Sequence, residues 1–280
     1  MGQPEQHAEG AGPFTTRRLW NRPEGGTVVW ESRPARRRGV LAVRGPGDTV
    51  TRSASADAEA LGRLRRLNAV ASAAFVLGGG LFALGAAVAQ FGSGEALVSA
   101  SVYFAGGLFF NLGGYTSLLQ VLNAPRHSPG GDRLVTARWR WWGYEPMRLD
   151  WLSTFLLFAG TLVFGVNLLD SFLQGLTAQQ LNRLVWTPDV VGCVLFLVSG
   201  HLGFVELCHR PRPCLRSRSL GWWVVAVNQL GSVLFMVSAL AAFTRPATGS
   251  LISSGIANWG TLCGALCFSA GGVLQGFERP

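Results

Sequence analysis

The sequence predicts an all-α transmembrane protein: a six-helix bundle from three tandem helical hairpins, preceded by a largely disordered basic tail. Six apolar stretches are long enough to cross a bilayer, each contains the same short motif, and the arginines concentrate in alternate connections. Of the 280 residues, 49% are hydrophobic and only 14% are charged, whereas soluble domains carry about 25% charged residues. Because about 20 apolar residues in a helix cross the hydrocarbon core, each stretch predicts one transmembrane helix.

Residues 1–66 form the predicted cytoplasmic tail, which is rich in Arg, Gly, Pro and Ser. This composition favours disorder, because it offers little apolar surface to bury. Two β-prone pieces at residues 27–30 and 39–43 predict at most a weak hairpin, since two short strands make no core of their own. Leucines recur at every third position from Leu61 to Leu67. They predict an amphipathic helix that lies on the membrane surface or continues into the first span.

Three hairpins follow the tail, and two basic connections join them. The hairpins are predicted at residues 67–122 (spans at about 69–90 and 97–120), 150–207 (spans at about 150–170 and 188–207) and 221–280 (spans at about 221–243 and 255–276). The connections are residues 123–149, rich in Arg and Trp, and residues 208–220. Pro188 suits the start of the fourth span, because the N–H that proline lacks needs no partner there.

The distribution of arginine predicts the orientation. All 24 basic residues are arginines, and 22 of them lie in the tail, in the two basic connections or after the last span. Only Arg183 and Arg245 lie in the other connections. Because basic loops stay in the cytoplasm, both termini are predicted to be cytoplasmic. The absence of lysine suggests a high-GC bacterial genome, so we expect a multi-pass protein of the bacterial cytoplasmic membrane.

A Gly-x-x-x-Phe motif lies near the middle of every span. Small residues let helices approach closely in lipid, so we expect each glycine to offer a groove and each phenylalanine to fill one on a neighbouring helix. The corresponding placement of the six copies indicates internal duplication. Ten residues beyond the motif phenylalanines of the even-numbered spans are Gln120, Glu206 and Glu278, for which we expect a role at the membrane boundary or in pairing with arginine. The predicted packing residues are Gly78, Phe82, Gly106, Phe110, Gly160, Phe164, Gly192, Phe196, Gly231, Phe235, Gly264 and Phe268.

The stretch 258–272, Asn-Trp-Gly-Thr-Leu-Cys-Gly-Ala-Leu-Cys-Phe-Ser-Ala-Gly-Gly, resembles the YrhK-type family of small bacterial membrane proteins, as does the stretch 160–164. Domains of that family are helical hairpins with Gly-x-x-x-Phe-x-x-(Gly/Ser) patterns. The tract 141–146, Trp-Trp-Gly-Tyr-Glu-Pro, is similar to larger multi-hairpin relatives. The resemblance covers roughly residues 65–280. It implies membrane hairpins but no known activity, so it assigns no functional residues.

Five polar residues within the spans could line a polar path. Ionisable groups inside a membrane are functional candidates, although a histidine that is hydrogen-bonded within the bundle would look the same in the sequence. These residues support an alternative function as a small transporter or channel, provided that they share one cavity. They are Asn111, Asn167, Asn228, His201 and Glu206.

No enzyme, metal or cofactor motif accompanies the spans. The five cysteines avoid the loops assigned to the outside, so a disulfide framework is not expected. The segment from Cys208 through His209 to Cys214 has too few ligands for a zinc site. A buried cysteine such as Cys193 is more often a small apolar residue than a metal ligand.

The favoured function is a structural or interaction role, in which a basic cytoplasmic face binds anionic lipid or a protein partner. Arginines near a membrane surface each contribute about 1 kcal/mol to contact with anionic headgroups. A homo-oligomer is also possible, whereas nucleic acid is a less favoured partner because orientation already explains the net charge of +9. The candidate lipid-facing residues are Arg36, Arg37, Arg38, Arg63, Arg65, Arg66, Arg138 and Arg140.

Overall fold

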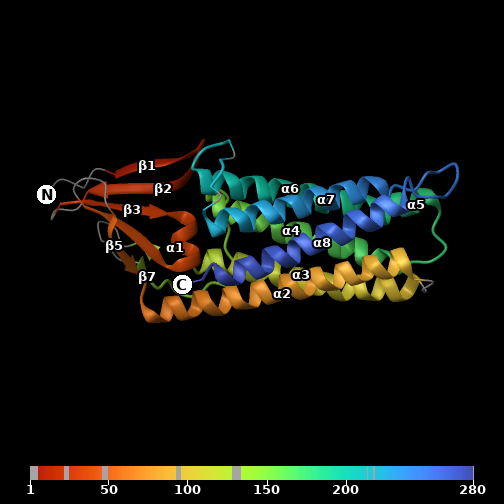
Figure 1. The fold of residues 1–280 in the computed structure, drawn as a ribbon, viewed down its shortest axis with the longest axis horizontal. Coiled ribbons are helices and arrows are strands. Elements are labelled where there is room, and N and C mark those ends of the chain that lie inside the picture. Colours follow the sequence, from red (N-terminus) through yellow and green to blue (C-terminus); the bar gives the residue numbers. More distant parts are fainter. Residues whose placement is uncertain are drawn as a thin grey trace.

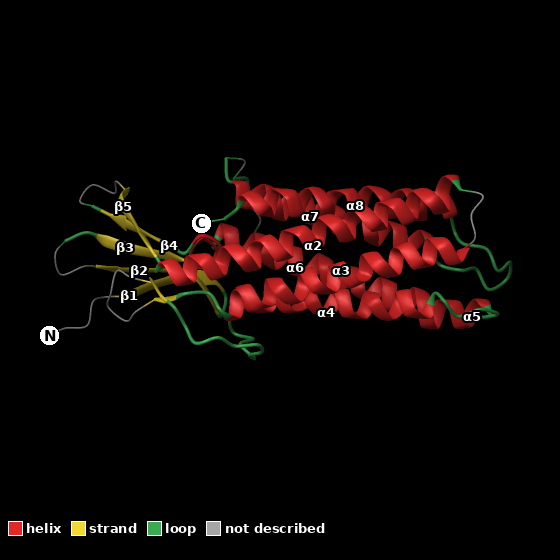
Figure 2. Ribbon diagram, turned by 90° about the horizontal axis from the view of Figure 1, so that it is seen from below, coloured by secondary structure: helices red, strands yellow, loops and turns green. Residues whose placement is uncertain are grey.

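A small β-sheet is attached to one end of a bundle of long helices, as Figure 1 shows for the computed structural model. The structure describes residues 6–21, 25–45, 50–92, 96–127, 134–212, 214–216 and 218–279. We call the end of the bundle next to the sheet the sheet end, and the opposite end, near α5, the far end. Both views place the sheet beyond the bundle rather than along its side (Figure 2).

Six helices are long and apolar enough to cross a membrane, as expected for a multi-pass membrane protein. The first of them continues from the predicted amphipathic segment without a break. A short helix and one turn of π-helix lead into the fourth. The helices are α2 (Ala58–Phe91), α3 (Ala96–Leu122), α4 (Leu149–Asp170), α5 (Ala178–Leu181), η1 (Asn182–Trp186), α6 (Thr187–Cys208), α7 (Leu220–Ala241) and α8 (Ser254–Phe277).

The outer surface of the bundle is apolar along the spans. Large aliphatic side chains are exposed on all six long helices, which would be unfavourable in water over so wide an area. Hydrocarbon chains of lipid are the surroundings in which such a surface is stable. Representative exposed residues are Leu77, Leu84, Leu108, Leu162, Val194, Val198, Leu230, Leu240 and Leu266.

The prediction of a disordered tail is wrong for the described residues of this segment. They form an antiparallel sheet in the order β1-β2-β3-β4-β5. The two pieces predicted to form a weak hairpin do pair with each other, with Val28 opposite Val43. The elements are β1 (Gln6–Ala11), β2 (Phe14–Asn21), β3 (Thr27–Glu31), α1 (Ser32–Arg38), β4 (Val40–Arg44) and β5 (Val50–Ser55). In the next basic connection, β6 (Arg126–His127) pairs with β7 (Leu134–Val135).

The sheet is stable because it shares a core with the bundle. Trp20, Val28 and Leu41 are buried together with Ala60 of α2 and Leu134 of β7. Two isolated strands would lack such a core. The composition of the tail alone does not reveal the apolar surface that α2 and the connection after α3 provide, and for this reason disorder was predicted.

The motif glycines and phenylalanines contact one another across three helix pairs. A Cβ atom built on Gly78 would lie 2.8 Å from the ring of Phe110, and one built on Gly106 would lie 2.9 Å from the ring of Phe82. The same reciprocal contact joins α4 to α6 and α7 to α8. Each glycine thus leaves room for the phenylalanine of the neighbouring helix, as the motif predicts.

The six motif phenylalanines form one cluster in the middle of the bundle. Phe82, Phe164 and Phe235 of the odd-numbered spans contact one another, with ring centroids 5.6 to 6.3 Å apart. Each also contacts the motif phenylalanine of its paired helix. Aromatic pairs at such distances are favourable beyond the area that they bury. The cluster is an apolar barrier between the two halves of the bundle.

Replacing Gly264 with alanine is expected to destabilise the bundle. The added Cβ atom would lie 2.6 Å from the ring of Phe235 and 3.0 Å from the carbonyl oxygen of Gly231, and overpacking of this kind costs about 1–3 kcal/mol. Gly80→Ala is the matched control, because nothing lies within 4 Å of its Cβ position. Thermal unfolding of the purified variants measures the difference. Equal melting temperatures for the two variants would contradict the close packing.

Candidate functional site: an arginine cluster at the sheet end

Helix α1 points three arginines into the sheet end of the bundle. The helix ends at Gly39, whose φ of 64° suits glycine and whose N–H donates to the carbonyl oxygen of Ala35 at 3.1 Å. Residues three and four apart share a face of a helix, so Arg33, Arg36 and Arg37 project together. Ala35 faces the opposite way, into the core of the sheet.

Two of these arginines form buried ion pairs with glutamates at the ends of the bundle helices. Arg33 donates to both carboxylate oxygens of Glu278, at 2.8 and 2.6 Å. Arg36 binds Glu206 in the same bidentate way, at 3.0 and 2.6 Å. Ser32 donates a further hydrogen bond to Glu206 at 2.7 Å. Planar guanidinium and carboxylate groups match in this geometry, which fixes the orientation of α1 as well as its position.

The third arginine has neutral partners. The Nη1 atom of Arg37 donates to the side-chain oxygens of Gln120, at 2.7 Å, and Asn68, at 3.0 Å. Asn68 in turn donates to the carbonyl oxygen of Gln275 at 2.9 Å. The Arg37 side chain is only 5% exposed, and within the described part of the chain no carboxylate pairs with this buried charge.

The three acceptors occupy corresponding positions in the sequence. Gln120, Glu206 and Glu278 each follow a motif phenylalanine by ten residues, and each binds a different arginine of α1. The expected pairing with arginine is therefore found, and its partners lie in the tail. We call Arg33, Arg36, Arg37 and these three acceptors the arginine cluster.

The surroundings change the pKa values of the ionised groups. Burial opposes the charge of Arg36, but Glu206 outweighs it and holds the pKa of Arg36 above its usual range. Burial likewise raises the pKa of Glu278, but Arg33 reverses this effect, so the net shift is downward. Burial, followed by the charges of Arg36 and Arg33, lowers the pKa of Arg37 to about 9. All three groups are therefore ionised near neutral pH.

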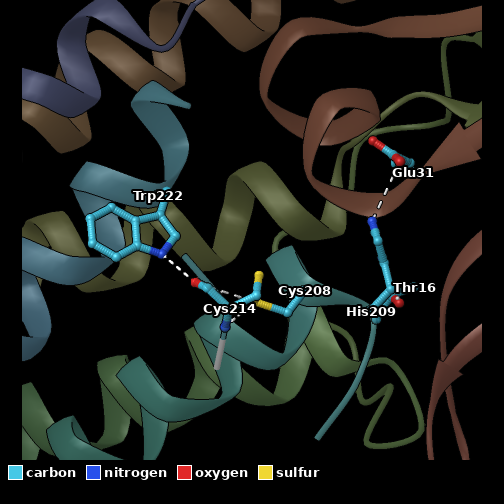
Figure 3. The surroundings of a disulfide bond; sticks show 6 residues. All are labelled: Thr16, Glu31, Cys208, His209, Cys214 and Trp222. Atoms are coloured by element: carbon cyan, nitrogen blue, oxygen red, sulfur yellow. Dashed lines mark hydrogen bonds and ion pairs between the residues drawn. A yellow bond between two sulfur atoms is a disulfide. The ribbon is translucent and has the colours of Figure 1, made fainter. Parts of the chain in front are cut away.

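A second contact between sheet and bundle lies at the end of α6. The ring of His209 lies 2.9 Å from Thr16 Oγ1 and 3.4 Å from a carboxylate oxygen of Glu31 (Figure 3). The hydrogen bond from His209 lowers the pKa of Glu31, against the opposing effect of burial. His209 has a φ of 53°, in the left-handed region that ends many helices. This turn directs the ring towards β2 and β3.

A disulfide framework is not expected from the sequence, yet the structure contains a disulfide. Cys208 and Cys214 form a disulfide, with Cα atoms 5.7 Å apart. The chain folds back after α6, and Trp222 of α7 donates to the carbonyl oxygen of Cys214 at 2.7 Å (Figure 3). The turn brings together two cysteines that are six residues apart. Spacing alone did not predict this pairing.

The five residues proposed to line a polar path do not share one cavity. His201 is exposed on the outside of the bundle, and Glu206 belongs to the arginine cluster. Asn111 lies where α3 packs against Gly165 of α4. Asn228 lines a cavity near the arginines, whereas Asn167 lines another at the far end. The phenylalanine cluster lies between these cavities, so the predicted path is not formed.

The cavity at the far end contains a carboxylate that the sequence analysis overlooked. Asp189, near the start of α6, lines this cavity of about 520 Å³ together with Tyr103 and Asn167. No basic side chain pairs with Asp189 among the described residues, and the sulfur of Cys193 lies 4.0 Å from one of its carboxylate oxygens.

The candidate lipid-facing arginines differ in exposure. Arg36 and Arg37 are buried in the arginine cluster, so their assignment to the lipid surface is wrong. Arg38, Arg65, Arg66 and Arg138 are exposed. The remaining two are half-buried: Arg63 bonds Glu59 and the carbonyl oxygen of Ala137, and Arg140 pairs with Glu145.

Known proteins and metal-site patterns do not identify the site. Within the described residues, no group of three or more His, Cys, Asp or Glu side chains is placed to hold a metal ion. No family model, curated protein or solved structure matches this chain. The resemblance to the YrhK-type family therefore stays a prediction.

Replacing Glu206 with glutamine is expected to destabilise the protein by about 3–5 kcal/mol, because Arg36 would remain buried without its counter-charge. Glu59→Gln is the control: Glu59 also pairs with an arginine, but its side chain is 71% exposed. Unfolding in denaturant measures both changes. The double variant Arg36→Met with Glu206→Leu should recover most of the loss, since it removes both charges. A Glu206→Gln variant as stable as Glu59→Gln would refute the role of the pair.

Proposed function

We propose that this chain is a multi-pass membrane protein with an interaction role, in which a ring of arginine and aromatic side chains at the sheet end binds anionic lipid headgroups. The arginine cluster holds the sheet against the bundle. The observation that supports the proposal is the combination of exposed positive charge and exposed aromatic rings at the same end of the bundle. This combination is typical of the headgroup layer.

The residues of the ring come from the sheet end of α2, from the connection between α3 and α4, and from the connection between α6 and α7. Trp141, Trp142 and Tyr144 are 66%, 55% and 77% exposed, which is unusual for such large rings in a soluble domain. Arg63 lies over the indole of Trp139, and the Cζ atom of Arg63 is 5.4 Å from the centroid of that indole. The exposed arginines of the ring are Arg65, Arg66, Arg138, Arg210, Arg212, Arg216 and Arg218.

We also propose that the sheet end faces the cytoplasm of a bacterial cell. The concentration of 22 of 24 basic residues in the tail (residues 1–66), in two connections and after α8 supports this orientation. The Cys208–Cys214 disulfide favours the opposite orientation, because disulfides persist mainly in oxidising compartments. The arginines carry more weight, since basic loops determine orientation during insertion, whereas a disulfide across a short loop contributes less to stability than one across a long loop.

The reciprocal glycine–phenylalanine contacts and the three matching acceptors support an origin by duplication of a helical hairpin. Under this proposal the hairpins are α2 with α3, α4 with α6, and α7 with α8. One duplicated unit would explain why each pair crosses at its glycines and why each second helix ends in a polar acceptor. We also propose, from the motifs at residues 160–164 and 258–272, that the chain belongs to the YrhK-type family.

An epitope inserted after Gly249, in the connection between α7 and α8, tests the orientation. Gly249 has a φ of 67° and an open Cβ position in an exposed turn, so an insertion there should leave the bundle intact. We expect antibody to label spheroplasts without permeabilisation. An epitope at the C-terminus is the control and should require permeabilisation. The reverse pattern would reverse the proposed orientation.

The lipid contact is tested by replacing two exposed arginines of the ring. Arg65→Gln with Arg66→Gln should weaken the affinity for phosphatidylglycerol by about 2 kcal/mol, since each arginine near the surface contributes about 1 kcal/mol. Native mass spectrometry of the protein with phosphatidylglycerol in a phosphatidylcholine background measures the retained lipid. The matched control is Arg183→Gln with Arg245→Gln, at the far end. Equal losses in the two double variants, or no loss in either, would contradict the proposal.

A further inference from the structure

The arginine cluster contains one more positive charge than negative charge. Arg33, Arg36 and Arg37 bring three positive charges, and Glu206 and Glu278 bring two negative ones. The third acceptor position is a glutamine, which is neutral. All of these side chains are less than 9% exposed, so water in contact with the surface does little to screen the excess charge.

Nearby charges do not remove this excess. Asp150, which lines a pocket together with Arg36, already pairs with Arg148 at 2.7 Å. Arg148 also pairs with Glu145, which in turn binds Arg140. Two arginines and two carboxylates therefore balance within that neighbouring network. An uncompensated charge in a protein interior is strongly unfavourable, which indicates that a counter-charge from outside the chain belongs here.

A cavity of about 90 Å³ lies directly beside the three arginines. Part of its wall is polar, with Ser117 and Gln275 next to the arginines. The opposite part is apolar and includes Phe196 and Phe268 of the phenylalanine cluster. A single water needs roughly 10–15 Å³ of such space, so the cavity has room for a monatomic ion and several waters.

Several buried hydrogen-bond donors around this cavity have no partner among the described residues. They include Nη1 of Arg36, Nε of Arg37, the side-chain NH₂ of Gln275 and the hydroxyl of Ser117. Each of these four side chains lines the cavity and is 5% exposed or less. Buried polar groups are nearly always paired. A cluster of unpaired donors next to excess positive charge calls for a ligand that accepts hydrogen bonds and is negatively charged.

We propose that this cavity binds one small inorganic anion, of the size of a halide, between the arginines of α1 and the polar wall formed by Ser117 and Gln275. Water would satisfy the donors but would leave the charge uncompensated. A metal cation would add to the repulsion. The anion links the sheet to the bundle, because its ligands come from α1 on one side and from α3 and α8 on the other.

Chloride replacement tests the proposal with the full chain in phosphatidylcholine nanodiscs. At constant ionic strength, exchange of gluconate for chloride should raise the melting temperature by several degrees and saturate, as expected for a ligand that binds only the folded state. Broadening of the chloride NMR signal by the protein gives a second, direct measurement of binding. A melting temperature and a line width that do not depend on the anion would overturn the proposal and show that water alone fills the cavity.

Gln120→Glu is the decisive variant. It places a carboxylate at the position where the other two second helices have one, so the cluster becomes neutral. We expect the variant without chloride to be at least as stable as the original protein with chloride. Its affinity for chloride should fall tenfold or more, because that is the scale of a lost contact between buried charges. Gln179→Glu, in the exposed α5, adds the same charge elsewhere and should retain the full chloride effect.

Arg37→Gln removes the excess charge by taking away one positive charge instead of adding a negative one. It should also abolish the chloride effect, while leaving both ion pairs with glutamate in place. This variant keeps the proposal falsifiable even if Gln120→Glu does not fold. Chloride dependence that survives in Arg37→Gln or in a folded Gln120→Glu would refute the site, as would its loss in Gln179→Glu.

Discussion

The burial of arginine charge at the sheet end is the constraint on which the rest of the structure depends. A guanidinium group in a low-dielectric interior is tolerated only with partners of good geometry. The bundle supplies these partners where α3, α6 and α8 end, and α1 carries its arginines at the spacing that reaches all three. The position of the sheet follows, because β3 and β4 flank α1 in the chain and must stay beside it. Shared apolar contacts with α2 then complete a core that the sheet lacks alone.

The middle of the bundle follows a different principle. Glycines bring the helix backbones close, and the phenylalanines opposite them fill most of the space that remains, with Thr161 as a polar side chain beside the rings. One polar cavity lies on each side of this layer. The sheet-end cavity has excess positive charge, whereas the far-end cavity contains the lone carboxylate of Asp189. The dispersed asparagines and His201 do not connect the two.

Arginine has two physical roles at the sheet end, and position alone separates them. Arg37 and Arg38 are neighbours in the sequence, yet the first is 5% exposed within the bundle and the second is exposed to solvent. Inside, the planar group fixes geometry through paired hydrogen bonds. Outside, its long apolar stem and charged tip suit the boundary between lipid tails and headgroups. Composition does not distinguish buried from exposed arginines. The basic tail was therefore predicted to form a single exposed surface, although some of its arginines lie inside the protein and hold the sheet to the bundle.

The sequence by itself determined the properties that depend on neighbouring residues. Hydropathy located six spans, the glycine–phenylalanine spacing predicted the contacts between helices, and the repeat register singled out Gln120, Glu206 and Glu278 as equivalent. The tertiary structure alone decided which groups these acceptors meet, since Arg36 and Glu206 are 170 residues apart. It also decided that the tail forms a sheet, that Cys208 pairs with Cys214, and that His201 faces outwards. The physical reason is that a charge or a strand is buried by segments that are distant in the sequence. A local sequence pattern contains no information about those segments.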